Sequence, residues 1–306
     1  MRKFIIKTLL LLLPIAFLAV SMEYLLQQIP NDYACKKKYF DKHSEKIQTL
    51  ILGSSHAYFG INPVYFSKNT FNASHVSQSL DFDLAILNKY QNNLGNLDII
   101  VLPISYFTLF GKLENGQEAW RVKNYTIYYG INAKSLSDCS ELLSNKLKRN
   151  IYRLYGYYVK NKNDITCTEL GWGTTYKSEL AKDLQETGKT AAKRHTRGDI
   201  LSEKNRKIFN ENLNILKSFS EFCSQRNIKL IFLTTPTYHT YRENINADQR
   251  AKMVETINNF VSKHSNFHYF NWFEDIDFIE EDFYDADHLN EIGVEKLSRK
   301  LSQHID

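Results

Sequence analysis

Two short segments near opposite ends of the chain carry the residue types of a nucleophile and its base. An apolar run leads into Gly53-Ser54-Ser55-His56, so these serines come where a strand is expected to end. A predicted amphipathic helix follows Asp285-Ala286-Asp287-His288. A serine hydroxyl attacks an acyl carbon when a base takes its proton and a carboxylate orients that base. The pattern predicts a serine-dependent ester or acyl-transfer site, with Ser55 as nucleophile, His288 as base and Asp285 as orienting acid.

Several of these residues also have an ordinary structural interpretation. Ser54 is the rival nucleophile, although support of the turn suits it better, because serine and glycine are common in turns. Asp287 could cap the following helix. His56 could line the pocket and bind substrate, or pack at a helix start. A metal would need His56, Asp285, Asp287 and His288 to converge with unusual geometry, so a metal site is kept only as a minor alternative and none is expected.

The elements that must position these residues alternate along the chain. Apolar runs predict strands at residues 49–52, 70–73, 97–104, 230–234 and 267–271, and apolar stripes predict helices at 80–92, 203–226, 247–263 and 290–303. Alternating strands and helices are typical of an α/β fold with a parallel sheet covered on both faces. In such sheets, reactive groups gather beyond the carboxyl ends of the strands. Ser55 is expected there, directly after the first strand.

The N-terminus combines a basic start with an apolar run. Arg2 and Lys3 come early in the chain, and residues 8–22 hold no charge. This pattern is typical of a signal peptide or an uncleaved anchor. We expect a signal anchor at residues 1–28, which makes the protein single-pass in a bacterial-type cell membrane with its folded domain extracytoplasmic, in the periplasm or on the cell surface. Cleavage after the small residues at 19–21 is the alternative.

The remaining chain is divided by its pattern. Residues 29–46 are polar and predict a stalk, and residues 47–306 predict one folded domain. From about 105 to 200 the strand–helix pattern breaks down, which indicates a long insertion. This insertion is rich in tyrosines, among them Tyr152 and Tyr155. They could stack on sugar rings or pack within a core and lid.

Composition excludes several classes of function. Hydrophobic residues make up 43% of the chain, which is ample for a globular core, and the net charge is +5. The basic clusters at 36–38 and 189–197 are not interleaved with aromatic residues, so no nucleic-acid partner is expected. The four cysteines show no metal-ligand spacing, so no zinc site is expected. No motif indicates a cofactor, and none is expected.

The two segments resemble the SGNH (GDSL-like) hydrolase superfamily. Gly53-Ser54-Ser55 stands for the family's first block and Asp285-Ala286-Asp287-His288 for its last, which implies a flavodoxin-like three-layer sandwich. The Gly-Ser-Ser variant with an N-terminal apolar segment is similar to the envelope branch, which includes teichoic-acid D-alanyl transfer and polysaccharide O-acetyl transfer proteins. The resemblance implies an esterase or O-acyltransferase for acyl groups, above all acetyl groups, of a cell-envelope polysaccharide, working beside a membrane-bound O-acyltransferase.

The oxyanion-hole blocks depart from the family's pattern. Residues 71–79 contain no glycine where the second block has one, and Pro103-Ile104-Ser105 lacks the Gly-x-Asn of the third. Beside the amide of Ser55, the candidate donors are Asn72, Ser77 and Ser105, with His56 as a further substrate-binding residue. The departure motivates an alternative function, a non-catalytic binding or scaffold partner of a membrane-bound O-acyltransferase.

Overall fold

The computed structural model describes residues 1–131 and 137–305. Contacts divide the chain into two compact units, unit 1 (Met1–Lys37 with Trp120–Ile165) and unit 2 (Lys38–Ala119 with Thr166–Asp306). The predicted boundaries differ from this division, because the insertion expected at 105–200 contributes to both units. All residues of the predicted serine site belong to unit 2.

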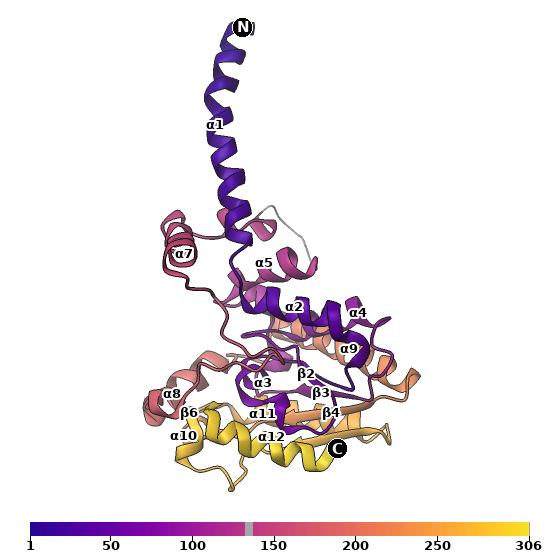
Figure 1. Ribbon diagram of the computed structural model, residues 1–306. Helices are drawn as coiled ribbons and strands as arrows, with labels where there is room; N and C mark the ends of the chain where they lie inside the picture. The colour runs from indigo at the N-terminus through magenta and orange to yellow at the C-terminus, as the bar shows by residue number, and fades with distance from the viewer. Residues whose placement is uncertain (132–136, 306) are drawn as a thin grey trace. The chain divides into compact units, whose positions relative to one another are not determined.

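A five-stranded sheet forms the centre of unit 2 (Figure 1). Its strand order is β2-β1-β3-β4-β5 and all its strand pairs are parallel. The strands are β1 (Thr49–Ile51), β2 (Thr70–Asn72), β3 (Ile99–Pro103), β4 (Lys229–Thr234) and β5 (Phe267–Asn271). In the register of the sheet, Leu50 lies opposite Phe71 on one side and Ile100 on the other. Every residue of β1, β2 and β3 is buried, as expected of strands covered on both faces.

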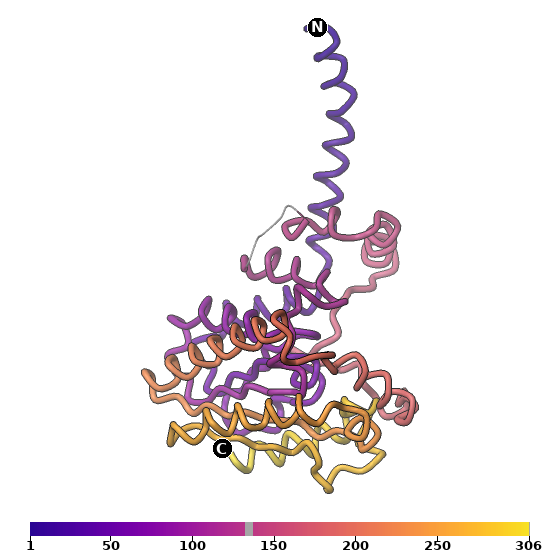
Figure 2. The backbone as a smooth tube through the Cα atoms, turned by 180° about the vertical axis from the view of Figure 1, so that it is seen from behind, coloured from indigo at the N-terminus to yellow at the C-terminus, as the bar shows by residue number. Residues whose placement is uncertain are grey.

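Helices cover both faces of this sheet, which confirms the predicted α/β class. Figures 1 and 2 show α4 and α9 on one side of the sheet and α12 on the other. The apolar stripe of α12, which includes Leu297 and Leu301, packs in one core cluster with Ile51, Val101 and Ile231 of the sheet. The helices of unit 2 are α3 (Ser55–Gly60), α4 (Leu80–Tyr90), α8 (Leu184–His195), α9 (Glu203–Gln225), α10 (His239–Arg242), α11 (Ala247–Val261) and α12 (Glu291–Ile305).

A two-stranded antiparallel hairpin precedes α12, where the sequence predicted only a loop. It consists of β6 (Phe283–Asp285) and β7 (His288–Leu289), and its register pairs Asp285 directly with His288. Residues that pair directly across antiparallel strands hold their side chains close together on one face. The hairpin therefore fixes the acid next to the histidine.

Unit 1 contains a long apolar helix, α1 (Arg2–Gln27). Its most apolar stretch of 18 residues has a mean hydropathy of 2.4 and none of it is buried. By length and composition α1 is suited to cross a membrane, and a signal sequence would meet the same criterion. The other helices of the unit are α5 (Val122–Asn124), the π-helical turn Tyr125–Tyr129, α6 (Glu141–Ser144) and α7 (Leu147–Lys160).

The segment 29–46, predicted as a stalk, contains helix α2 (Asp32–His43), whose residues up to Lys37 belong to unit 1 and whose later residues belong to unit 2. Tyr33, Lys36 and Phe40 are buried along it. Their spacing of three and four residues places them on one face of the helix. Because most residues of the segment are polar, its composition does not indicate this narrow buried stripe.

Candidate functional site

The serine turn depends on a glycine that a larger residue would strain. Gly53 has φ +109°, a backbone conformation that residues with a Cβ rarely adopt, and a Cβ there would lie 3.3 Å from the Pro103 side chain. The Gly53 N–H donates to Oδ1 of Asp83 at 2.7 Å. The chain leaves β1 through this turn and enters α3 at Ser55. The half-buried Ser55 thus lies beyond the carboxyl end of β1, as predicted.

The structure brings Ser55, His288 and Asp285 together. His288 Nε2 lies 2.8 Å from Ser55 Oγ, and His288 Nδ1 lies 2.9 Å from Asp285 Oδ1. Since the carboxylate accepts the Nδ1–H, Nε2 carries the lone pair that faces the serine hydroxyl. His288 and Asp285 are both buried, which keeps water away from the ion pair that proton transfer would create. Both distances lie in the hydrogen-bonding range required of a nucleophile, its base and its orienting acid.

A second carboxylate, Asp287, faces His288 from the same hairpin. Its Oδ1 lies 3.6 Å from His288 Nδ1 and has no hydrogen-bond partner within the described residues. Burial alone would lower the pKa of His288, but the charges of Asp285 and Asp287 outweigh burial and raise it. Burial also acts to raise the pKa of Asp287, yet the surrounding histidines hold it well below its usual value. Asp287 is therefore an ionised, buried charge beside the base.

Asp287 is also the end of a second chain of polar contacts. Its Oδ2 lies 3.3 Å from His56 Nε2, and His56 Nδ1 lies 2.5 Å from Ser105 Oγ. His195 Nδ1 and Arg194 approach the same carboxylate at 3.7 and 3.8 Å. Burial lowers the pKa of His56, so this ring is neutral, donates from Nε2 to Asp287 and accepts the Ser105 hydroxyl proton at Nδ1.

This arrangement decides what two of the predicted oxyanion donors do. The hydroxyl of Ser105 donates to His56 Nδ1, so its hydrogen is already used within the fold. The amide of Asn72 donates to the carbonyls of Ala57 at 2.9 Å and Ile61 at 2.8 Å, so both of its hydrogens are used within the fold. The third candidate, Ser77, is half-buried in the loop after β2 and has φ +61°, a conformation that favours glycine.

Sequence reasoning missed three contributors to the site. Asp83 holds the turn at Gly53, and burial raises the pKa of its carboxyl to about 7. The sequence offered one signal for Asp83, because this acid follows Leu80 by three residues and so lies near the apolar stripe of a predicted helix. In the structure Asp83 is buried, whereas its neighbour Leu84 is only half-buried. Asp287, considered as a helix cap, instead binds His56. His195 lies in the predicted insertion, where no spacing linked it to the site.

Three residues of the site have side chains that could bind a metal ion. His56, Asp287 and His288 each bring one ligand atom within 4.8 Å of the others. However, both ring nitrogens of His288 already face hydrogen-bond partners, Ser55 at Nε2 and Asp285 at Nδ1. An ion bound through His288 would break one of these bonds, so a metal and an intact serine–histidine–aspartate arrangement exclude each other.

Aromatic rings line the side of the site next to His288. Tyr176 is stacked between Phe59, with ring centroids 3.6 Å apart, and Tyr284, at 3.8 Å, and its edge approaches His288. Both faces of Tyr176 are covered by other side chains. This tyrosine of the predicted insertion therefore packs as a wall of the site and does not offer a free face for a sugar ring.

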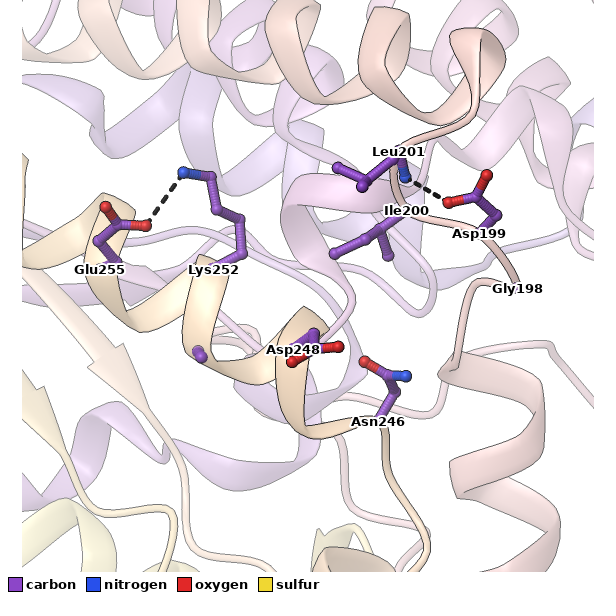
Figure 3. A pocket seen from close by; sticks show the side chains of 9 residues that line it. Gly198, Asp199, Ile200, Leu201, Asn246, Asp248, Lys252 and Glu255 are labelled. Atoms are coloured by element: carbon purple, nitrogen blue, oxygen red, sulfur yellow. Dashed lines mark hydrogen bonds and ion pairs between the residues drawn. The ribbon is translucent and has the colours of Figure 1, made fainter.

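A surface pocket of about 620 Å³ lies elsewhere in unit 2 (Figure 3). It is formed by the loop 198–201 and by Asn246 with the first turns of α11. The charged side chains that line it are Asp199 in the loop and Asp248, Lys252 and Glu255 on that helix. None of the predicted site residues lines it.

Solved structures of other proteins are similar to this chain at low sequence identity. No protein-family model and no curated protein matches the chain. A solved GDSL-like lipase from Bacteroides thetaiotaomicron is similar to it at 10% identity and a TM-score of 0.40, over 88% of this chain and 98% of its own. A candidate acylhydrolase from Bacteroides fragilis shows 10% identity and a TM-score of 0.41, over 87% and 95%. A candidate platelet activating factor from Streptococcus pneumonia shows 12% identity and a TM-score of 0.42, over 97% and 99%.

Proposed function

We propose that this protein is a serine esterase or O-acyltransferase. The observation that supports the proposal is the hydrogen-bonded series Ser55–His288–Asp285, with distances of 2.8 and 2.9 Å. Three groups of these types in this order perform nucleophilic acyl chemistry on unrelated folds. In this proposal Ser55 is the nucleophile, His288 the base and Asp285 its orienting acid.

The proposed reaction has two halves. Ser55 Oγ attacks the acyl carbonyl carbon while its proton passes to His288 Nε2, and Asp285 and Asp287 stabilise the imidazolium that forms. The tetrahedral intermediate then expels the alcohol of the acyl donor, which takes the proton from His288. An acyl-Ser55 ester remains. A sugar hydroxyl or water attacks this ester, gives its proton to His288 and restores the Ser55 hydroxyl. Transfer results in the first case and hydrolysis in the second.

The substrate we propose is an acylated, above all acetylated, cell-envelope polysaccharide. The apolar helix α1 supports an extracytoplasmic location at the membrane, where such glycans are modified. The resemblance of the serine and Asp-x-x-His segments to envelope proteins of the SGNH superfamily supports the same substrate class. For the transfer reaction, we propose a membrane-bound O-acyltransferase that delivers the acyl group as the partner.

A specific observation favours a second candidate function. Two of the expected oxyanion donors, Asn72 and Ser105, are used in hydrogen bonds within the fold. Loss of one oxyanion donor typically costs about 10²–10³ in rate. In the second candidate the protein keeps the fold without catalysis and binds the glycan or the membrane-bound acyltransferase as a scaffold.

A fluorophosphonate probe distinguishes the two functions, because it reacts with a serine that a histidine activates. We expect wild-type protein to be labelled, Ser55→Ala and His288→Ala to be unlabelled, and Ser54→Ala, the matched neighbour, to be labelled like wild type. The acyl content of the envelope glycan in cells at matched expression should fall with Ser55→Ala and stay with Ser54→Ala. If folded wild-type protein is not labelled by the probe, the proposal of an enzyme is wrong and the scaffold function takes its place.

A further inference from the structure

Helix α7 of unit 1 turns an apolar face away from the protein. Leu147, Ile151, Tyr155 and Val159 recur every four residues, which places them on one face of the helix. Their exposed fractions are 60%, 54%, 50% and 60%. A helix at the surface of a water-soluble domain normally presents its polar face to solvent. The outward face of α7 has the opposite character.

The inner face of the same helix is polar and firmly held. Asn150 is completely buried and its amide donates to the carbonyls of Glu141 and Leu142, both at 3.3 Å. Arg153 donates to the carboxylates of Glu141 at 2.7 Å and Asp164 at 2.9 Å. A rotation that buried the apolar face would break these bonds and take from the buried Glu141 carboxylate one of its two cations, Arg153 and Lys123. The outward orientation is therefore built into the unit.

Cations border the apolar face. A groove of about 550 Å³ on α7 is lined by Lys146, Lys148, Arg149 and Lys162, with Asp164 as its acid. Lysine and arginine can keep their charged heads among phosphates while their aliphatic stems lie along an apolar surface. The combination of an exposed apolar stripe with a basic border is typical of helices that lie in the headgroup region of a membrane.

The place of α7 within unit 1 agrees with such a role. The Tyr158 hydroxyl donates to the carbonyl of Leu25, close to the end of α1. Figure 1 shows α7 beside this end of α1. Glu23, the acid that ends the uncharged run of α1, accepts the N–H groups of Glu141 at 2.9 Å and Leu142 at 2.8 Å in front of α7. These contacts fix α7 beside the point where the apolar helix would leave a bilayer.

We propose that α7 lies on the surface of an anionic lipid bilayer, with its apolar face at the boundary between headgroups and acyl chains and its cations among the lipid phosphates. Charge complementarity and continuity with the apolar surface of α1 single out a lipid surface as the occupant. The inference is independent of the serine site, because α7 belongs to unit 1 and the serine site to unit 2.

The test is a depth measurement on the full chain reconstituted in nanodiscs of phosphatidylglycerol and phosphatidylcholine. A nitroxide is placed at Ile151→Cys, or at Tyr155→Cys as a second reporter, with Cys35, Cys139 and Cys167 replaced by serine. Lys204→Cys on the exposed side of α9 is the matched control. We expect the α7 labels to collide with oxygen more often, and with a water-soluble nickel complex several-fold less often, than the control label.

Charge and lipid dependence separate this proposal from other occupants. Lys148→Glu combined with Arg149→Glu, or nanodiscs of phosphatidylcholine alone, should reduce the shielding of the Ile151 label. Labels that meet the nickel complex as often as the control would overturn the proposal. The proposal would also be overturned if the Ile151 label stayed equally shielded in detergent without lipid and light scattering showed a dimer. That result would show that a second copy of the chain covers this face.

Discussion

Replacement of Asp287 by asparagine should change the pH dependence of the serine site in a defined direction. Asparagine keeps the size of the side chain and an oxygen that can accept from His56, but it removes the buried charge that faces His288 at 3.6 Å. The titratable groups around Asp287 are His56, His195 and His288, and Arg194 is the permanent charge beside it. The charge of Asp287 raises the pKa of His288, so its removal must lower that pKa.

The magnitude follows from the distance. Two unit charges 3.6 Å apart interact by about 4–5 kcal/mol at an effective dielectric constant of about 20. Because two oxygens share the carboxylate charge and neighbouring histidines already compensate part of it, we expect about 1.4–2.7 kcal/mol, a decrease of about one to two pKa units for His288. His288 must be neutral to accept the serine proton, so the acid limb of the reaction should move to lower pH by that amount. The rate on the plateau should fall by up to about 10–100-fold, because the imidazolium loses the same stabilisation.

The assay is the second-order rate of fluorophosphonate labelling between pH 4 and 9, which needs neutral His288 and no knowledge of the natural substrate. Asp199→Asn, an exposed acid in the pocket of Figure 3, is the matched control and should leave the acid limb where it is. An acid limb of Asp287→Asn that stays in place or moves to higher pH would refute the electrostatic role of Asp287. An unchanged plateau rate would show that the imidazolium does not depend on it.

Two further predictions concern the turn at Gly53 and the loop after β2. The pKa of Asp83 is about 7 in the folded protein and its unfolded value is near 4, so the folded state binds the extra proton between these values and stability falls as pH rises from about 4 to 7. Asp83→Asn should keep the hydrogen bond to Gly53, remove the dependence of the melting temperature on pH and raise the free energy of unfolding at pH 7 by about 2–4 kcal/mol. A pH dependence that persists in this variant would contradict the burial argument. Ser77→Gly should stabilise the protein by about 0.5–1 kcal/mol in urea unfolding, because glycine adopts φ +61° without strain, and a less stable variant would contradict it.

The sheet could be predicted because its strands are short continuous apolar runs. Residues 97–104 hold β3 (Ile99–Pro103), and residues 247–263 hold α11 (Ala247–Val261), since a buried strand and a helix with one apolar stripe leave distinct patterns. The three residues proposed for catalysis were found by a different route. Their types and order restrict the chemistry, and strand ends of a parallel sheet converge at one edge.

The remaining features depend on contacts between distant segments. Asp287 meets His195, which belongs to a stretch without strand or helix periodicity in the sequence, so no local pattern could join them. The hairpin that pairs Asp285 with His288 contains only five residues in its two strands, too few for a period of two to show. The oxyanion candidates Asn72 and Ser105 had suitable side chains, but their hydrogens are used by partners that only the tertiary structure brings near.

Ser105, His56 and Asp287 repeat the residue types of the proposed catalytic series, and one variant decides whether they repeat its role. The ring is reversed, with Nδ1 toward the serine and Nε2 toward the acid, and Ser105 is buried with 4% of its surface exposed. No acyl carbon can approach a hydroxyl in that position, so we expect this series to hold Asp287 in place. Ser105→Ala should leave His56 Nδ1 without its donor, which costs about 1–3 kcal/mol of stability. The fluorophosphonate probe should still label Ser55 of this variant to full stoichiometry. A folded Ser105→Ala variant that cannot be labelled would instead show that Ser105 acts in the reaction as an oxyanion donor.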